Sequence, residues 1–116
     1  MSPKSTSKRN KPQIQARIRF LRPEEGGRHS PAFTGYRPMI WLGATTADGN
    51  KSYLDGEISV AGTDELRLGK SYIVAIRLLH PEYAGPLKPG DHIELSEGPN
   101  IVGTGEVLES TLKNHG

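Results

Sequence analysis

The sequence predicts a small all-β domain, either a barrel or a sandwich, and three observations support this fold class. Apolar residues alternate with polar ones in several short segments, which is the pattern of a half-buried strand. Clusters of Gly, Pro, Asp and Asn separate these segments, and no window of about 11 residues shows helical periodicity. A length of 116 residues with 34% hydrophobic residues provides one core of modest size and leaves no room for a second domain.

Two strands and a long loop are predicted in the first half of the chain. Residues 13–20 form the first strand, because β-branched and aromatic residues occupy every second position. Residues 22–35 form a loop rich in Gly, Pro and charge. Residues 36–44 contain a run of apolar side chains and form the second strand, although Pro38 should keep this end at an edge of the sheet or outside the strand ladder. Residues 48–50 supply turn chemistry after it.

The second half of the chain contributes further strands with turns between them. They are predicted at residues 57–60, at 70–79, from 93–95 onward and at 101–108, with turn-forming residues at 61–64, 81–90 and 97–100. The 70–79 segment is apolar on both faces, with Ile73, Ala75 and Leu79 on the second face. Such a strand is typical of a closed or covered sheet.

Two glycines in the last predicted strand favour closure of the sheet. Gly103 and Gly105 lie two positions apart on one face, where they leave room for tight curvature or a closely packed neighbour. A closed barrel also removes the exposed strand edges that promote aggregation. We therefore expect the substitution Gly105→Val to lower the Tm.

The charge of the chain is distributed unevenly along the sequence. The formal net charge is +2, but residues 1–12 alone carry +4, while residues 1–44 carry +7 and residues 45–116 carry −5. A basic terminus can bind nucleic acid or an acidic partner, or it can be a disordered, solubilising tail. We expect a basic disordered tail at 1–12, the β-domain at 13–110 and a second tail at 111–116.

Several classes of function are excluded by composition and spacing. The chain has no Cys, no long apolar run and no apolar segment after its basic start, so a soluble cytoplasmic domain is expected. The acidic residues are scattered and the four His lack metal-ligand spacing, which predicts no catalytic site, metal or cofactor. Residues 68–71 match only the end of a phosphate-binding loop, because Asp64 stands where its first Gly is required.

The most informative segment is the loop EEGGRHSPAFTGYRP at residues 24–38. Its two adjacent glycines permit a positive φ or a close backbone approach, and its two arginines can bind carboxylate or phosphate. Aromatic and proline residues add apolar surface and stiffness, which is typical of a loop that presents a binding surface. The alternative is an ordered barrel crossover in which Arg28 and Arg37 pair with Glu24 and Glu25.

These residues resemble the C-terminal, third domain of the bacterial elongation factor Tu family, whose GTPase carries aminoacyl-tRNA to the ribosome. The loop at 24–38 is similar to the signature loop of that domain, and residues 17–21, 68–81 and 97–107 are similar to its first strand, central strand and closing hairpin. The resemblance covers roughly residues 14–109. It implies a six-stranded antiparallel β-barrel with no catalytic role.

The resemblance also implies candidate contacts. In the family, the loop around residues 26–29 lies near the GTPase domain and the tRNA, Glu97 stands at an acidic position facing the T stem, and His80 stands where a basic residue is frequent. Met39 replaces a Gln that reaches the T stem, residues 99–101 lack the usual Arg, and the 45–67 connection is longer than usual. Without a GTPase domain, GTP-dependent delivery of aminoacyl-tRNA is not expected of this chain alone.

Two hypotheses of function follow, and a decayed fragment that binds nothing is disfavoured by the intact alternation of three strands. In the first, the chain binds tRNA or another structured RNA through phosphate contacts, using residues 1–12 together with Arg17, Arg19, Arg28, His29, Arg37, His80 and Glu97. In the second, the loop docks a protein such as a GTPase domain or another translation partner, using Gly26, Gly27, Arg28, His29, Phe33, Tyr36 and Arg37, with Trp41 as a further anchor if it is exposed.

Overall fold

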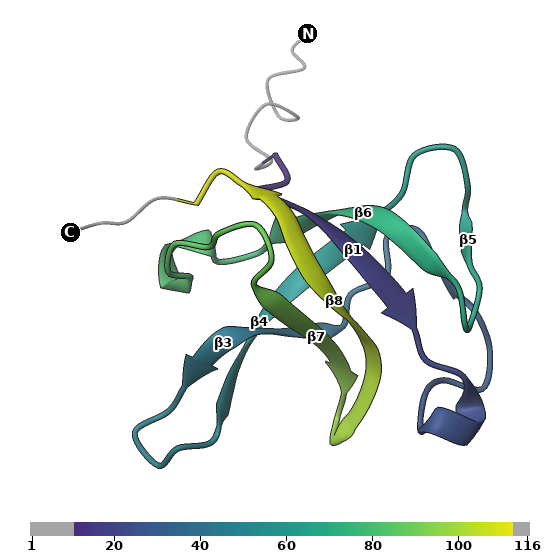
Figure 1. Ribbon diagram of the computed structural model, residues 1–116, viewed down its shortest axis with the longest axis horizontal. Coiled ribbons are helices and arrows are strands. Elements are labelled where there is room, and N and C mark those ends of the chain that lie inside the picture. Colours follow the sequence, from purple (N-terminus) through teal and green to yellow (C-terminus); the bar gives the residue numbers. More distant parts are fainter. Residues whose placement is uncertain (1–10, 113–116) are drawn as a thin grey trace, which may run out of the picture.

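The chain folds into a closed barrel of six antiparallel strands (Figure 1). The computed structural model describes residues 11–112, so the expected tails at 1–12 and 111–116 lie largely outside the described residues. The barrel strands are β1 (Ile14–Phe20), β3 (Met39–Thr45), β4 (Lys51–Ser59), β6 (Ser71–Leu78), β7 (His92–Glu97) and β8 (Asn100–Ser110). They follow the order β1-β6-β4-β3-β7-β8, and β8 pairs with β1 to close the barrel. The predicted six-stranded antiparallel barrel is confirmed.

Four short elements decorate the loops of the barrel. Two-residue strands β2 (Ala32–Phe33) and β5 (Glu65–Leu66) pair with each other, and two 3-10 turns, η1 (Pro23–Glu25) and η2 (Pro81–Tyr83), follow β1 and β6. Neither short strand was predicted, because two residues cannot display a periodicity. Within residues 11–112, no helix is long and apolar enough to cross a membrane.

The core is built from the alternate residues of each strand that point into the barrel. Sixteen apolar residues between positions 11 and 112 are buried, and those from β1, β6 and β7 follow the predicted period of two. Phe20, at the end of β1, packs its ring against Tyr36 and Tyr72, with ring centroids 6.3 and 6.2 Å apart. These ring contacts connect the core to the loop that follows β1.

The seam between β1 and β8 explains the glycine pair of the last strand. A Cβ atom on Gly105 would lie 1.8 Å from the carbonyl oxygen of Arg17, so no side chain fits at this position. Gly103 is less restricted, because a Cβ there would lie 3.3 Å from the nearest side-chain atoms. The expected close packing is confirmed, and Gly105 is the residue on which it depends.

Two predicted strand boundaries were wrong. The strand predicted at 57–60 extends over Lys51–Ser59, and the strand predicted at 36–44 begins only at Met39. Pro38 has no N–H to donate, and Tyr36 forms only an isolated bridge with Ile58. The expected turn at 48–50 is present, with Gly49 at a φ of 86°.

The outer face of β6 carries apolar residues that the closed barrel does not cover throughout. The inner face is fully buried at Val74, Ile76 and Leu78, but Ile73 on the outer face is 53% exposed. Barrel closure pairs the edges of a strand without covering its outer face. The sheet is therefore closed, as predicted, but not covered at this position.

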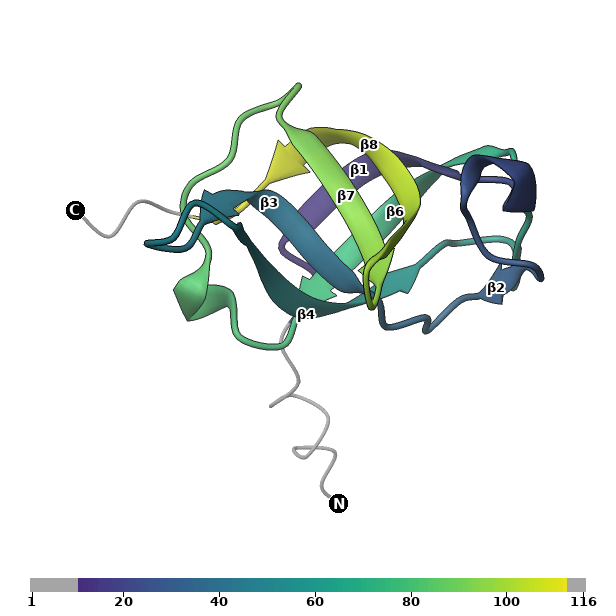
Figure 2. The same ribbon diagram turned by 90° about the horizontal axis from the view of Figure 1, so that it is seen from below.

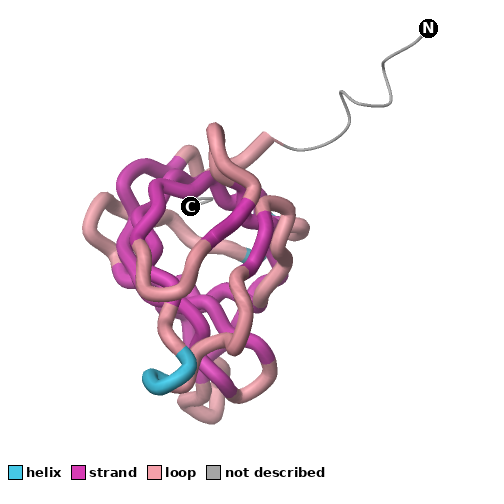
Figure 3. The backbone as a smooth tube through the Cα atoms, turned by 90° about the vertical axis from the view of Figure 1, so that its right-hand side faces the viewer, coloured by secondary structure: helices cyan, strands magenta, loops and turns pink. Residues whose placement is uncertain are grey.

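The loops gather at two opposite ends of the barrel (Figure 2). One end carries η1 and the β2–β5 pair, and the other carries η2 together with the tip of the β3–β4 hairpin. Figure 3 views the molecule from the first end and shows the strands arranged around the barrel, with η1 in cyan. The candidate site lies at this end.

Candidate functional site

The loop after β1 is shaped by two adjacent glycines with different roles. Gly26 ends η1 with a φ of 92°, a conformation that side chains disfavour. Gly27 has no positive φ, but a Cβ atom on it would lie 2.2 Å from the carbonyl oxygen of Leu21. The turn that precedes Arg28 therefore requires both a left-handed residue and a close backbone approach, as the sequence predicted for this pair.

Glu25 fastens the start of the same loop. The backbone N–H of Arg22 donates a hydrogen bond of 2.8 Å to its carboxylate, and Arg19 lies 3.1 Å away. The Arg22 hydrogen bond, followed by that of Arg19, lowers the pKa of Glu25. The carboxylate therefore stays ionised and braces η1 against β1.

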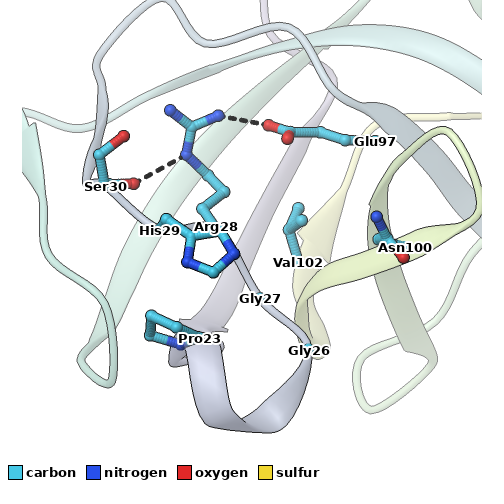
Figure 4. Close-up of a pocket in the computed structure, with 9 residues that line it drawn as sticks. All are labelled: Pro23, Gly26, Gly27, Arg28, His29, Ser30, Glu97, Asn100 and Val102. Atoms are coloured by element: carbon cyan, nitrogen blue, oxygen red, sulfur yellow. Dashed lines mark hydrogen bonds and ion pairs between the residues drawn. The ribbon is translucent and has the colours of Figure 1, made fainter.

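Arg28 is the central side chain of the site (Figure 4). Its Nε donates to the backbone oxygen of Ser30 at 3.0 Å, and its Nη1 donates to the carboxylate of Glu97. The guanidinium also lies 5.1 Å from the ring centroid of Tyr36, within cation–π range. The side chain of Arg28 is only 24% exposed. Burial opposes its charge, but the contacts with Glu97 and Tyr36 outweigh burial and raise the pKa of Arg28.

Tyr36 completes what we call the Arg28 cluster, namely Arg28, Tyr36 and Glu97. Its hydroxyl donates to the same Glu97 oxygen that accepts from Arg28. Burial, followed by this hydrogen bond to an ionised acceptor, raises the pKa of Tyr36. Arg28 lies in the first half of the loop and Tyr36 in the second, so the cluster connects both halves of the loop to the turn between β7 and β8.

A polar cavity of about 470 Å³ opens beside the cluster (Figure 4). It is lined by Pro23, Gly26, Gly27, Arg28, His29, Ser30, Glu97, Asn100 and Val102. His29, Ser30 and Asn100 are exposed, so their polar atoms are accessible to a ligand. The cavity suits a small polar group of a partner.

A second hollow of about 300 Å³ also borders Arg28. It is lined by Arg28, Ala32, Phe33, Thr34, Gly35 and Tyr36. Phe33 is 59% exposed, which makes it an accessible apolar anchor, whereas Tyr36 is half-buried by its cluster contacts. The loop therefore presents a polar cavity and an apolar side chain next to each other.

The remaining predicted arginines are paired with carboxylates. Arg17 lies 3.3 Å from Glu106, Arg19 lies 3.1 Å from Glu25, and Arg37 lies 3.9 Å from Glu57. The alternative in which both loop arginines pair with Glu24 and Glu25 is wrong. The turn of η1 directs Glu24 and Glu25 toward Arg22 and Arg19 instead.

Two other predicted residues lie away from the loop. His80 precedes η2 at the opposite end of the barrel, where it lies 3.5 Å from Glu82 (Figures 1 and 2). Trp41 is half-buried on β3, and its indole N–H donates to the backbone oxygen of Ala44 at 2.7 Å. The site is therefore formed by the loop and the β7–β8 turn without these two residues.

Four residues of the cavity were not predicted as site residues, namely Pro23, Ser30, Asn100 and Val102. Ser30 belongs to the loop at 24–38 and Pro23 directly precedes it, so their place beside the two glycines was the available signal. Asn100 is the last residue of the turn predicted at 97–100 and Val102 lies two positions further along β8, and the hairpin brings both to the same cavity. Among residues 11–112, no group of three or more His, Asp or Glu side chains is arranged to hold a metal ion.

The comparison with protein families agrees with this architecture. The family model described as the elongation factor Tu C-terminal domain matches residues 7–111 of the 116-residue chain. The match includes every strand of the barrel, the loop at 24–38 and the β7–β8 turn. It confirms the resemblance inferred from the motifs. The chain therefore belongs to the elongation factor Tu C-terminal domain family.

Proposed function

We propose that this chain is a non-catalytic, translation-related module that docks a protein partner through the surface of residues 22–38. One observation carries the choice of a protein partner. Arg17, Arg19, Arg28 and Arg37, which would supply the phosphate contacts, each lie within 4.0 Å of a carboxylate of the chain itself.

An internal ion pair weakens the case for phosphate binding. An arginine must give up its carboxylate, or share it with an anion that the carboxylate repels, before it contacts a phosphate. Residues 13–116 carry a net charge of −2, which adds repulsion from a nucleic acid. Protein partners do not impose this cost, because they can present apolar and cationic groups.

The loop has the features of a prepared protein-binding surface. The Arg28 cluster holds the loop in one conformation, which lowers the entropy lost on binding. Phe33 is exposed beside the cluster and supplies an aromatic anchor. The polar cavity beside Arg28 adds groups that can form hydrogen bonds with the partner. The family context makes a GTPase domain supplied by another chain, or another translation factor, the partner class to test first.

The experiment is an isothermal calorimetric titration of the full chain with the isolated GTPase domain of an elongation factor Tu. Phe33→Ser should weaken binding about tenfold, because the contact area of an exposed aromatic side chain is lost. Ile73→Ser removes a similarly exposed side chain from the outer face of β6 and should leave the affinity unchanged. Equal effects of the two substitutions would contradict the docking surface.

RNA binding is the second candidate, and the charge of +4 on residues 1–12 favours it. Fluorescence anisotropy of labelled bulk tRNA, titrated with the full chain at two salt concentrations, tests it directly. Four to six phosphate contacts predict a steep loss of affinity with salt, and deletion of residues 1–12 should weaken binding further. An anisotropy that does not change even at low salt would reject RNA binding.

A further inference from the structure

A further groove, more apolar than the cavity beside Arg28, lies at the end of the barrel opposite the loop of residues 22–38. It has a volume of about 360 Å³ and is lined by Leu42, Ala44, Ser52, Leu54, Tyr83, Ala84 and Gly85. These residues come from the β3–β4 hairpin and from the segment that begins with η2. Both elements lie at the same end of the molecule (Figures 1 and 2).

The groove exists because the β3–β4 hairpin extends beyond the neighbouring strands β7 and β6. β7 pairs with only Met39, Ile40 and Trp41 of β3, and β6 pairs with only Gly56–Ser59 of β4. Beyond these positions, the two strands of the hairpin have only each other as neighbours in the sheet.

The inward-facing pattern of the hairpin continues past the end of the barrel. Ile40 and Ile58 are fully buried inside the barrel. Two positions further out on β3, Leu42 is half-buried, and Leu54, the partner of Ile40 on β4, is half-buried as well. The apolar face that belongs to the core is therefore only partly covered where it leaves the barrel.

Tyr83 borders this partly covered face. Its side chain is 73% exposed, the highest exposure among the large hydrophobic residues of the described chain, and its ring lies 5.9 Å from that of His80. Ala84, the next residue, is 8% exposed and anchors the segment to the core. An exposed aromatic ring on an anchored segment beside an apolar groove is typical of a binding anchor.

The charges of the two segments indicate the chemistry of the occupant. Residues 42–55 and 80–91 together contain four acidic residues and two lysines. One of these lysines, Lys51, is tied to Glu94 on β7. Asp55 directly follows the lining residue Leu54 and Glu82 directly precedes the lining residue Tyr83, so the segments that form the groove carry an excess of negative charge. A cationic partner complements this charge.

We propose that this groove binds an amphipathic, basic segment of a protein partner. A large aliphatic side chain of the segment fills the space between Leu42 and Leu54 and packs against Tyr83, while flanking Lys or Arg residues face the acidic surroundings. This is the helix-in-groove mode of recognition. The groove lies at the other end of the barrel from the docking surface, so the proposal is independent of the function proposed above.

The test uses the full chain and a fluorescein-labelled amphipathic helix of about 18 residues made of Leu and Lys. The same helix with Glu in place of every Lys is the comparison probe. We expect saturable binding of the Leu–Lys helix and at least about tenfold weaker binding of the Leu–Glu helix, because charge complementarity is reversed.

Three variants locate the binding. Tyr83→Ser should weaken binding of the Leu–Lys helix about fivefold to tenfold, and Ala44→Lys should weaken it similarly by placing a cation at an exposed lining position. Ile73→Ser, on the outer face of β6, should not change it. The proposal would be overturned by any of three results. These are an absence of saturable binding, equal binding of the Leu–Glu helix, or an affinity for the Leu–Lys helix in Tyr83→Ser and in Ala44→Lys that is no lower than in Ile73→Ser.

Discussion

Arg28 and Glu97 lie 69 positions apart in the sequence and form an ion pair that fastens the loop after β1 to the turn between β7 and β8. One oxygen of Glu97 accepts from both Arg28 and Tyr36. A single carboxylate from a distant strand pair therefore holds two side chains of the loop. This arrangement leads to measurable consequences for stability and for titration.

The first prediction concerns the loss of Arg28. Arg28→Ala should lower the free energy of unfolding by about 1–2 kcal/mol, since it removes charge-assisted hydrogen bonds at a largely buried side chain. Arg17→Ala is the matched control, because the Arg17–Glu106 pair is about half exposed on both sides and should contribute between zero and about 1 kcal/mol. Urea unfolding of both variants measures the difference. Equal losses would show that the Arg28 pair acts as an ordinary surface pair.

The second prediction concerns the ionisation of Tyr36. Because its pKa is raised in the folded state, the phenol contributes stability that is fully present below the ordinary value of 10.0 and is lost as the pH rises above it. An alkaline titration followed by tyrosinate absorbance should show a delayed fraction in the folded chain. Tyr36→Phe should remove that fraction, and its persistence in the variant would assign it to another tyrosine.

The third prediction concerns the seam between β1 and β8. Gly105→Val should destabilise the barrel by about 3 kcal/mol or more, because its Cβ would collide with the backbone of Arg17. Gly85→Val is the control, since a Cβ at Gly85 has no neighbour within 4 Å. Thermal unfolding should give a large drop in Tm for the first variant and little change for the second. A Tm for Gly105→Val close to that of the unmodified chain would mean that the seam can open without cost.

The fourth prediction concerns Glu94, whose side chain is 13% exposed and contacts both Lys51 and His92. Burial opposes its ionisation, but Lys51 and then His92 outweigh burial and lower the pKa of Glu94 below the ordinary 4.5. Its contribution to stability is therefore present above pH 4.5 and is lost as the pH falls through the lowered pKa. The difference in Tm between the unmodified chain and Glu94→Gln should be largest near neutral pH and shrink in acid. A difference that does not vary with pH would contradict this assignment.

The strands that could be predicted are those whose inner face is fully buried. β1 alternates apolar and polar residues because every second side chain enters the core, whereas β6 is a nearly continuous apolar run whose inner face is buried. The outer part of β4 was missed because residues 51–55 leave the barrel, so that neither face is strongly buried and the pattern fades. Closure itself was predicted from the strand at 70–79, which is apolar on both faces, and from the pair Gly103 and Gly105, which indicated tight curvature or a closely packed neighbour.

The candidate site could be predicted as a list of residues but not as an arrangement. Arg28, Tyr36 and Glu97 were each singled out by motif, yet 13 acidic residues compete for the arginine in the sequence. Only the packing of the β7–β8 turn against the loop selects Glu97. A linear pattern carries no information about such contacts, which explains why the expected partners Glu24 and Glu25 were wrong.

The pairing of β1 with β8 also has a consequence for folding during synthesis. The register runs from Ile14 opposite Ser110 to Phe20 opposite Gly103, so the first strand made meets its second neighbour only when the last strand is made. During synthesis, β1 and β7 therefore each keep one unpaired edge until β8 is made, and such an edge can pair with other chains and promote aggregation. Because β8 fills the gap between β7 and β1, the barrel can close only after β8 has been made.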